Sequence, residues 1–155
     1  MIDAPLYIHF IFSCFSTVGF AIFLNSPKSI LSHVGVIGGI GWTVYVFLIN
    51  NSFSPILTNF IAAALVSIFS EILARKLKHP AISFVIPGII PLVPGLSLYN
   101  TMLYLVQNNY DSAISTGATT LFVSGAIALG VLIVSSLFRT LTILKYNFNN
   151  KKAAN

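Results

Sequence analysis

The sequence carries very little charge for its length. Of its 155 residues, 7% are charged, with 3 acids and 8 bases, whereas charged residues make up about 25% of an ordinary soluble domain. So few charges cannot cover the surface of a soluble domain of this size. Hydrophobic residues make up 56% of the chain, and its mean hydropathy is +0.91. The composition therefore excludes a soluble globular domain and indicates a membrane protein.

Residues with reactive side chains are also scarce. Cys14 is the only cysteine, so no intrachain disulfide can form. The three histidines, His9, His33 and His79, lie in separate elements without the spacing of a metal site. No nucleophile and base are spaced for catalysis. We therefore expect no enzyme activity, no cofactor and no metal.

Five apolar segments divide the chain. They cover about 5–24, 30–49, 55–74, 81–107 and 113–137, and each reaches the length of about 20 residues that a helix needs to cross a membrane. Short polar links at 25–29, 50–54, 75–80 and 108–112 separate them. The pattern predicts an all-α polytopic membrane protein: a single transmembrane domain over 1–140 with five transmembrane helices, followed by a short basic cytoplasmic tail at 141–155.

The bases are distributed asymmetrically along this pattern. If the fourth segment crosses once, all eight fall on one face: Lys28, Arg75, Lys76, Lys78, Arg139, Lys145, Lys151 and Lys152. A hairpin at the fourth segment would instead split them four and four. The positive-inside rule favours five crossings, with the N-terminus outside and the C-terminus in the cytoplasm. Because topology explains these positions, the net charge of +5 does not indicate a nucleic-acid partner.

The fourth segment contains the sequence PGIIPLVPG at 87–95. Prolines cannot donate the helical hydrogen bond, so we expect two half-helices, 81–86 and 96–106, joined by an irregular stretch. Irregular backbone at membrane depth must be buried in protein or line a wet cavity, and broken helices mark substrate sites in transporters. The alternative is a kink that only shapes packing. The predicted substrate-binding residues at the break are Pro87, Gly88, Pro91, Pro94 and Gly95.

Three further polar side chains are candidates. Tyr99 and Asn100 follow the break closely enough to touch a ligand. Glu71 is the only acid inside a predicted span, and ionisable groups in membranes are often functional. Glu71 is therefore a candidate for ion coupling, but Arg75 lies four residues later, so an interfacial ion pair explains it equally well.

The break and its surroundings resemble a known family. The sequence PGIIPLVPG, preceded by SEILARKLKHPA at 70–81 and followed by SLYN at 97–100, is similar to the threonine/serine exporter family. Five spans without a soluble N-terminal region match its short, split type, equivalent to the C-terminal half of the full-length exporter. This resemblance implies a bacterial cytoplasmic (inner) membrane protein that exports small hydrophilic amino acids with a second, larger subunit equivalent to the N-terminal half.

The substrate stays open between two classes. Some split pairs of this family are associated with a dicarboxylate, succinate, instead of amino acids. Carbonyls at the end of the first half-helix and amides at the start of the second would suit a zwitterion, whereas a dicarboxylate would need cationic partners. A scaffold subunit that transports nothing is a third possibility. Small residues on the spans, such as the pair Gly35 and Gly39, predict close helix contacts and allow a higher oligomer.

Overall fold

The computed structural model describes residues 5–153, and side chains as far as residue 144. In this range the chain forms α1 (Leu6–Phe23), η1 (Lys28–Ile30), α2 (Leu31–Asn50), α3 (Pro55–Leu77), α4 (Ile82–Ile89), η2 (Ile90–Leu92), α5 (Gly95–Val106) and α6 (Tyr110–Ala153), without any strand. Four helical segments are long and apolar enough to cross a membrane. Residues 82–92 and 95–106, bent by 54°, make a fifth when counted as one span. The expected all-α fold with five spans, the fourth broken, is confirmed.

The helices end where the polar links begin, and each link contains one residue in the left-handed region. These four residues are Asn25, Ser52, Lys78 and Asn108, with φ between 55° and 63°. A left-handed residue stops a helix because it turns the chain away from the helical path. At the start of α3, Ser54 Oγ accepts a hydrogen bond from the Leu57 amide at 3.3 Å, and Pro55 occupies the first helical position.

The break differs from the expected form in its extent. An irregular stretch over all of 87–95 is wrong: α4 continues through Pro87 to Ile89, and a 3-10 turn follows. Helical conformation persists because Pro87 removes one hydrogen bond only, whereas the φ of proline suits a helix. The chain leaves helical geometry at Val93 (ψ 128°) and Pro94 (ψ 57°), immediately before α5.

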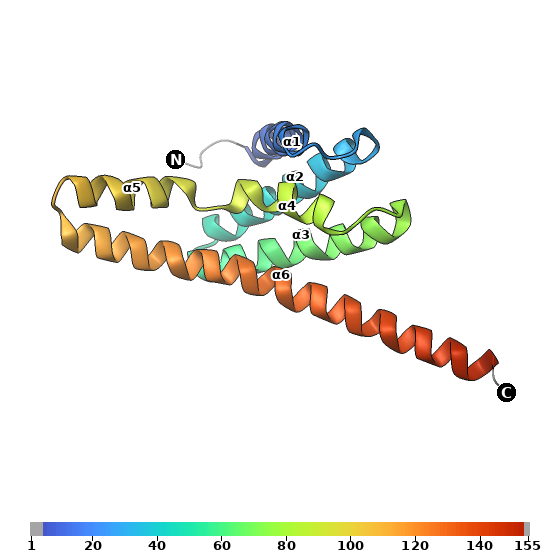
Figure 1. Ribbon diagram of the computed structural model, residues 1–155. Coiled ribbons are helices and arrows are strands. Elements are labelled where there is room, and N and C mark those ends of the chain that lie inside the picture. Colours follow the sequence, from blue (N-terminus) through green and yellow to red (C-terminus); the bar gives the residue numbers. More distant parts are fainter. Residues whose placement is uncertain (1–4, 154–155) are drawn as a thin grey trace.

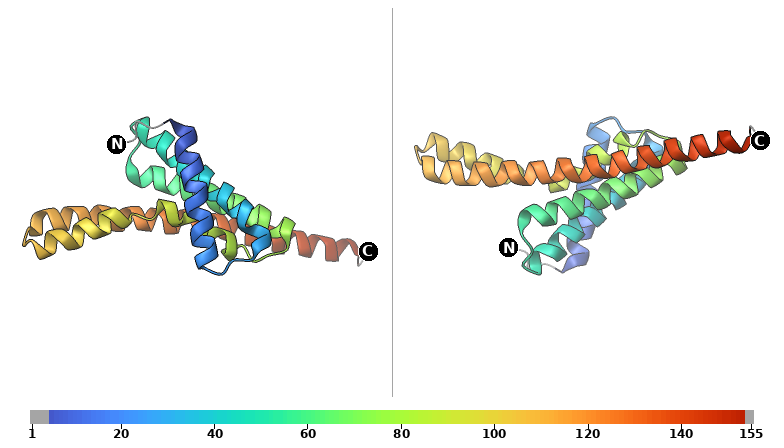
Figure 2. Two further views of the ribbon diagram at one scale, coloured as in Figure 1. Left: turned by 90° about the horizontal axis from the view of Figure 1, so that it is seen from above. Right: turned by 90° about the horizontal axis from the view of Figure 1, so that it is seen from below.

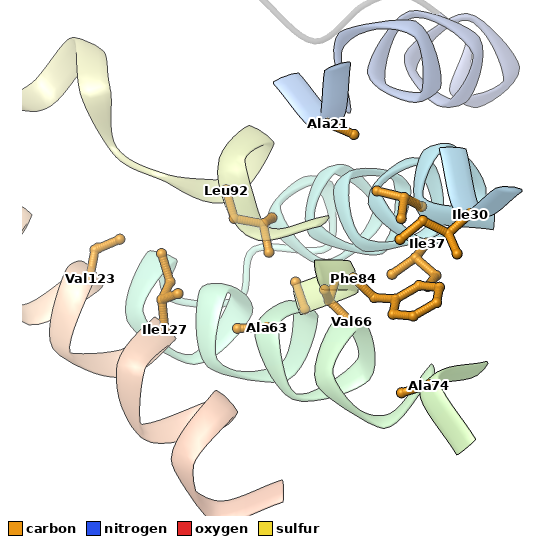
Figure 3. Packing of buried hydrophobic residues seen from close by; sticks show 12 residues of the cluster. Ala21, Ile30, Ile37, Ala63, Val66, Ala74, Phe84, Leu92, Val123 and Ile127 are labelled. Atoms are coloured by element: carbon orange, nitrogen blue, oxygen red, sulfur yellow. The ribbon is translucent and has the colours of Figure 1, made fainter. Parts of the chain in front are cut away.

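Helices α1 to α4 form the packed part of the molecule (Figures 1 and 2). Helix α2 lies against α1, and a methyl group added at Gly35 would stand 2.7 Å from Val18 Cγ2. A methyl group added at Gly39 would likewise stand too close to Cys14 Sγ and to the Phe10 ring. The expected close helix contact at this glycine pair is therefore confirmed. In Figure 3, Phe84 of α4 lies beside Ile37 of α2 and Val66 of α3, at the centre of the buried cluster.

Helix α5 and the first part of α6 form a hairpin that extends away from this part, whereas the middle of α6 packs on α3 (Figures 1 and 2). No residue of α5 is buried. Helix α6 has 44 residues, which corresponds to a length of about 66 Å, and it continues from the expected span into the segment expected as a tail. Where α6 crosses α3, a methyl group at Gly130 would stand 2.8 Å from the Phe60 carbonyl oxygen, so the two backbones touch.

The segments that carry the bases gather at one end of the molecule. Figure 1 shows the α1–α2 link and the α3–α4 link near each other, with the C-terminal end of α6 on the same side but projecting beyond them, opposite the α5–α6 link. Ser29 Oγ of the first link lies 3.4 Å from His79 Nε2 of the second. Arg75 Nη2 donates a hydrogen bond of 3.0 Å to the Phe138 carbonyl of α6. The fold therefore brings together the segments that the charge pattern assigned to one face.

Candidate functional site

A cavity of about 550 Å³ opens beside the break, and we call it the break cavity. Residues of α1, α2, α3, α5 and α6 contribute to its wall. The cavity lies where the bend at Val93 and Pro94 separates α5 from α2 and α3. The lining residues are His9, Trp42, Tyr45, Val46, Pro55, Asn59, Pro91, Leu92, Val93, Pro94, Gly95, Leu96, Ser97, Thr119, Thr120 and Val123. The wall is mainly apolar. Its polar side chains include His9, Asn59 and Ser97, and the described lining residues include no Asp, Glu, Lys or Arg.

The structure brings three of the predicted site residues together and separates the others. Pro91, Pro94 and Gly95 line the break cavity. Pro87 and Gly88 are buried in α4, where a methyl group at Gly88 would stand 3.0 Å from Val66 Cγ1. These two residues therefore contribute to the packing of α4 on its neighbours and are not part of the cavity wall.

Two other candidates lie beyond the cavity on α5. Tyr99 is 63% exposed, and Asn100 is half-buried. Neither residue belongs to the wall of the break cavity. Their side chains follow the break in sequence, but the bend carries α5 away from α2 and α3.

Glu71 lies on α3, also outside the break cavity. Its Oε2 is 3.6 Å from Arg75 Nη2. The same Arg75 guanidinium stands 5.0 Å above the ring of Phe138 and donates to the Phe138 carbonyl. Glu71 thus forms an ion pair within α3 with the residue that contacts α6, and this ion pair is enough to explain its position. A role of Glu71 in ion coupling remains a prediction.

His9 and Trp42 form the wall between α1 and the break. The Trp42 indole N–H donates to His9 Nδ1 at 3.4 Å, and the Trp42 ring stacks on Tyr45 with centroids 5.1 Å apart. His9, Trp42 and Pro91 also line a neighbouring cavity of about 400 Å³ on the α1 side. In the sequence analysis His9 was considered only as a metal ligand and was rejected for lack of suitable spacing, so its place beside the break was not predicted.

Helices α3 and α6 supply further polar groups, in addition to Ser97 of α5. Asn59 Nδ2 donates to the Pro55 carbonyl at 2.8 Å. The hydroxyls of Thr119 and Thr120 donate to carbonyls one turn earlier in α6, so only their oxygen lone pairs remain to face a ligand. Sequence reasoning did not single out these three residues. A polar amide within an apolar span was the available signal for Asn59.

A multi-pass helical bundle whose fourth span bends beside a cavity is typical of membrane transport proteins, in which broken helices mark substrate sites. Comparison of the sequence with known protein families identifies the family: residues 9–137 match the one described as "Threonine/Serine exporter, ThrE". Because this match covers most of the chain, the protein belongs to the threonine/serine exporter family.

The chain is also similar to a longer protein. It is 27% identical over 137 residues to an uncharacterized protein of Haemophilus influenzae (strain ATCC 51907 / DSM 11121 / KW20 / Rd). The similarity covers 83% of this chain and 46% of that relative, so the chain spans about half of the relative's length. No solved structure is detectably similar to the chain.

Proposed function

We propose that the protein is one membrane subunit of a two-component exporter of small hydrophilic metabolites, with threonine and serine as substrates. The break cavity carries this proposal. It lies where the fourth span bends, it is large enough for a small amino acid, and its described lining offers hydrogen-bonding groups without a fixed charge. A zwitterion brings no net charge into such a site, whereas a dicarboxylate brings two negative charges without a cation to compensate them.

A second, larger subunit completes the transport path in this proposal. Helix α5 has no buried residue of its own. This exposure favours a partner whose helices cover α5. The subunits lie in the bacterial inner membrane, with the N-terminus outside and the C-terminus in the cytoplasm, since the bases then lie inside.

The experiment is a transport assay of the chain with and without the membrane protein encoded beside it. Proteoliposomes are loaded with labelled serine, threonine or succinate, and efflux is measured. We expect efflux of the two amino acids when both subunits are present. Succinate efflux alone would support the dicarboxylate alternative. Normal efflux from the partner alone would show that this chain is a scaffold.

Orientation is tested separately with reporter fusions. A reporter active in the cytoplasm should give signal after Lys152, and one active outside should give signal within the link at 108–112. The opposite pattern would contradict five crossings with the N-terminus outside.

A further inference from the structure

Two residues that line the break cavity each have a buried polar atom without a hydrogen-bond partner. The two atoms are His9 Nε2 and Asn59 Oδ1. Buried polar atoms almost always have partners, and no lipid tail can supply one. Three hydroxyls elsewhere in α3 are also unpartnered, but they do not line the cavity. Hydroxyl hydrogens can rotate towards a neighbour, whereas the ring nitrogen and the amide oxygen are fixed by their other contacts.

The contact with Trp42 determines the chemistry of His9. An indole N–H can only donate, so His9 Nδ1, at 3.4 Å, must be the acceptor and carries no hydrogen. In a neutral imidazole the hydrogen then lies on Nε2. The unpartnered atom of His9 is therefore a hydrogen-bond donor.

The contact with Pro55 determines the chemistry of Asn59 in the same way. A carbonyl can only accept, so the group 2.8 Å from the Pro55 carbonyl oxygen is the NH₂ of the Asn59 amide. The unpartnered Oδ1 is therefore an acceptor. Asn59 is only 3% exposed, and its amide is held by the first turn of α3.

We propose that His9 and Asn59 determine the specificity of the site: His9 Nε2–H donates to the carboxylate of the solute, and Asn59 Oδ1 accepts from its ammonium group. This inference rests on the proposed function and assigns its selectivity to two side chains. One neutral donor and one neutral acceptor complement a zwitterion, but a dianion finds no second donor of this kind. Because both atoms are covered by neighbouring atoms, the proposal includes a side-chain movement that uncovers them when the solute enters.

Trp42 offers a direct measurement of binding, because it is the only tryptophan of the chain and lies against His9. The chain is labelled with 5-fluorotryptophan, combined with its unlabelled partner in nanodiscs, and titrated with serine, threonine and succinate. The fluorine signal then reports occupancy of this cavity. We expect saturable shifts with the two amino acids and much weaker binding of succinate.

The variants remove one hydrogen-bonding group each. His9→Leu and Asn59→Leu should weaken serine binding by about ten-fold or more, as expected for hydrogen bonds to charged groups. His9→Gln should recover most of the affinity, because its amide can donate from a similar position. Asn59→Asp keeps an acceptor and adds negative charge, so it should increase the preference for serine over succinate. This ratio does not depend on the fraction of folded protein.

Two matched controls lie outside the break cavity. Asn51 Nδ2 donates to the carbonyl four residues earlier at 2.7 Å, as Asn59 does, but at an exposed position. His33 is an exposed histidine whose Nδ1 lies 3.4 Å from Ser32 Oγ. Asn51→Leu and His33→Leu should bind serine with wild-type affinity.

Several results would overturn the proposal: no shift with serine or threonine at millimolar concentration, unchanged serine affinity in both leucine variants, or an unchanged serine-to-succinate ratio in Asn59→Asp. Failure of the proposed function gives a different result. A pair of subunits that binds serine through His9 and Asn59 but does not carry it across proteoliposomes would contradict the export of serine and leave the assignment of the two side chains intact.

Discussion

The dipeptide Pro-Gly occurs twice in the broken span, at 87–88 and at 94–95, in two different environments. The first pair is buried within α4, and a methyl group at Gly88 would stand 3.0 Å from Val66 Cγ1 and 3.4 Å from Ile37 Cγ2. The second pair lies at the bend, where Gly95 is exposed and a methyl group would meet nothing within 4 Å. Identical local sequences thus serve helix packing in one place and the cavity wall in the other.

The difference shows that only one of the two Pro-Gly pairs borders the break cavity. Before the bend, α4 touches α2 and α3, so side-chain volume there is limited by neighbouring helices. After the bend, α5 leaves these helices and contacts mainly α6, which leaves space for a solute. Substitutions on the two sides should therefore fail for different reasons.

The largest effect should follow Gly88→Leu. Four additional carbons would have to displace Val66 and Ile37 from a packed core, and overpacking by even a few atoms costs about 1–3 kcal/mol. We expect a large loss of folded protein in the membrane and a lowered thermal midpoint in detergent. Gly88→Ala, which needs only a small shift of Val66, should remain abundant. Equal abundance of Gly88→Leu and wild type would place this glycine outside the packed part.

Gly95→Leu should be abundant but inactive. The side chain has space at its own position, and it adds bulk to a residue that lines the break cavity. We expect efflux to fall by about ten-fold or more, as displacement of polar contacts with a solute would cause. Gly125→Leu is the matched control, because Gly125 is equally open and lies outside the cavity. If Gly95→Leu transports as well as this control, the cavity is not the solute path.

Cysteine labelling should separate the same two glycines without added bulk. In a Cys14→Ala background, Gly95→Cys should react with a small water-soluble thiol reagent, and serine should slow the reaction. Gly88→Cys should remain unreactive in intact membranes because it is buried between helices. Similar labelling of both positions would mean that α4 and α5 are equally open to water.

The smallest effects should come from Glu71, which does not line the break cavity. Its contact with Arg75 is a partly exposed ion pair, and such pairs contribute at most about 1 kcal/mol to stability. Glu71→Gln should keep efflux within about five-fold of wild type, the factor that corresponds to about 1 kcal/mol. Arg75→Ala should lower the thermal midpoint further, since it also removes the contacts with Phe138. A loss of transport and of its pH dependence in Glu71→Gln would instead support ion coupling.

Much of the fold could be predicted because the bilayer imposes simple rules on the chain. The lengths of apolar segments, the polar links and the proline-rich interruption all follow from residue type and order. The candidate site was predicted only in part. Pro91, Pro94 and Gly95 line the break cavity, but His9, Asn59 and the two threonines of α6 were missed because they come from three other helices and show no pattern in sequence.

The sequence by itself determined that the protein is helical, that it lies in a membrane and that its fourth span is broken, since hydrophobicity, charge and the missing N–H of proline act locally. Only the tertiary structure decided which Pro-Gly pair faces a cavity, because that depends on how far α5 bends from α2 and α3. It also decided which nitrogen of His9 carries the hydrogen, since this depends on an indole 33 residues away in the chain.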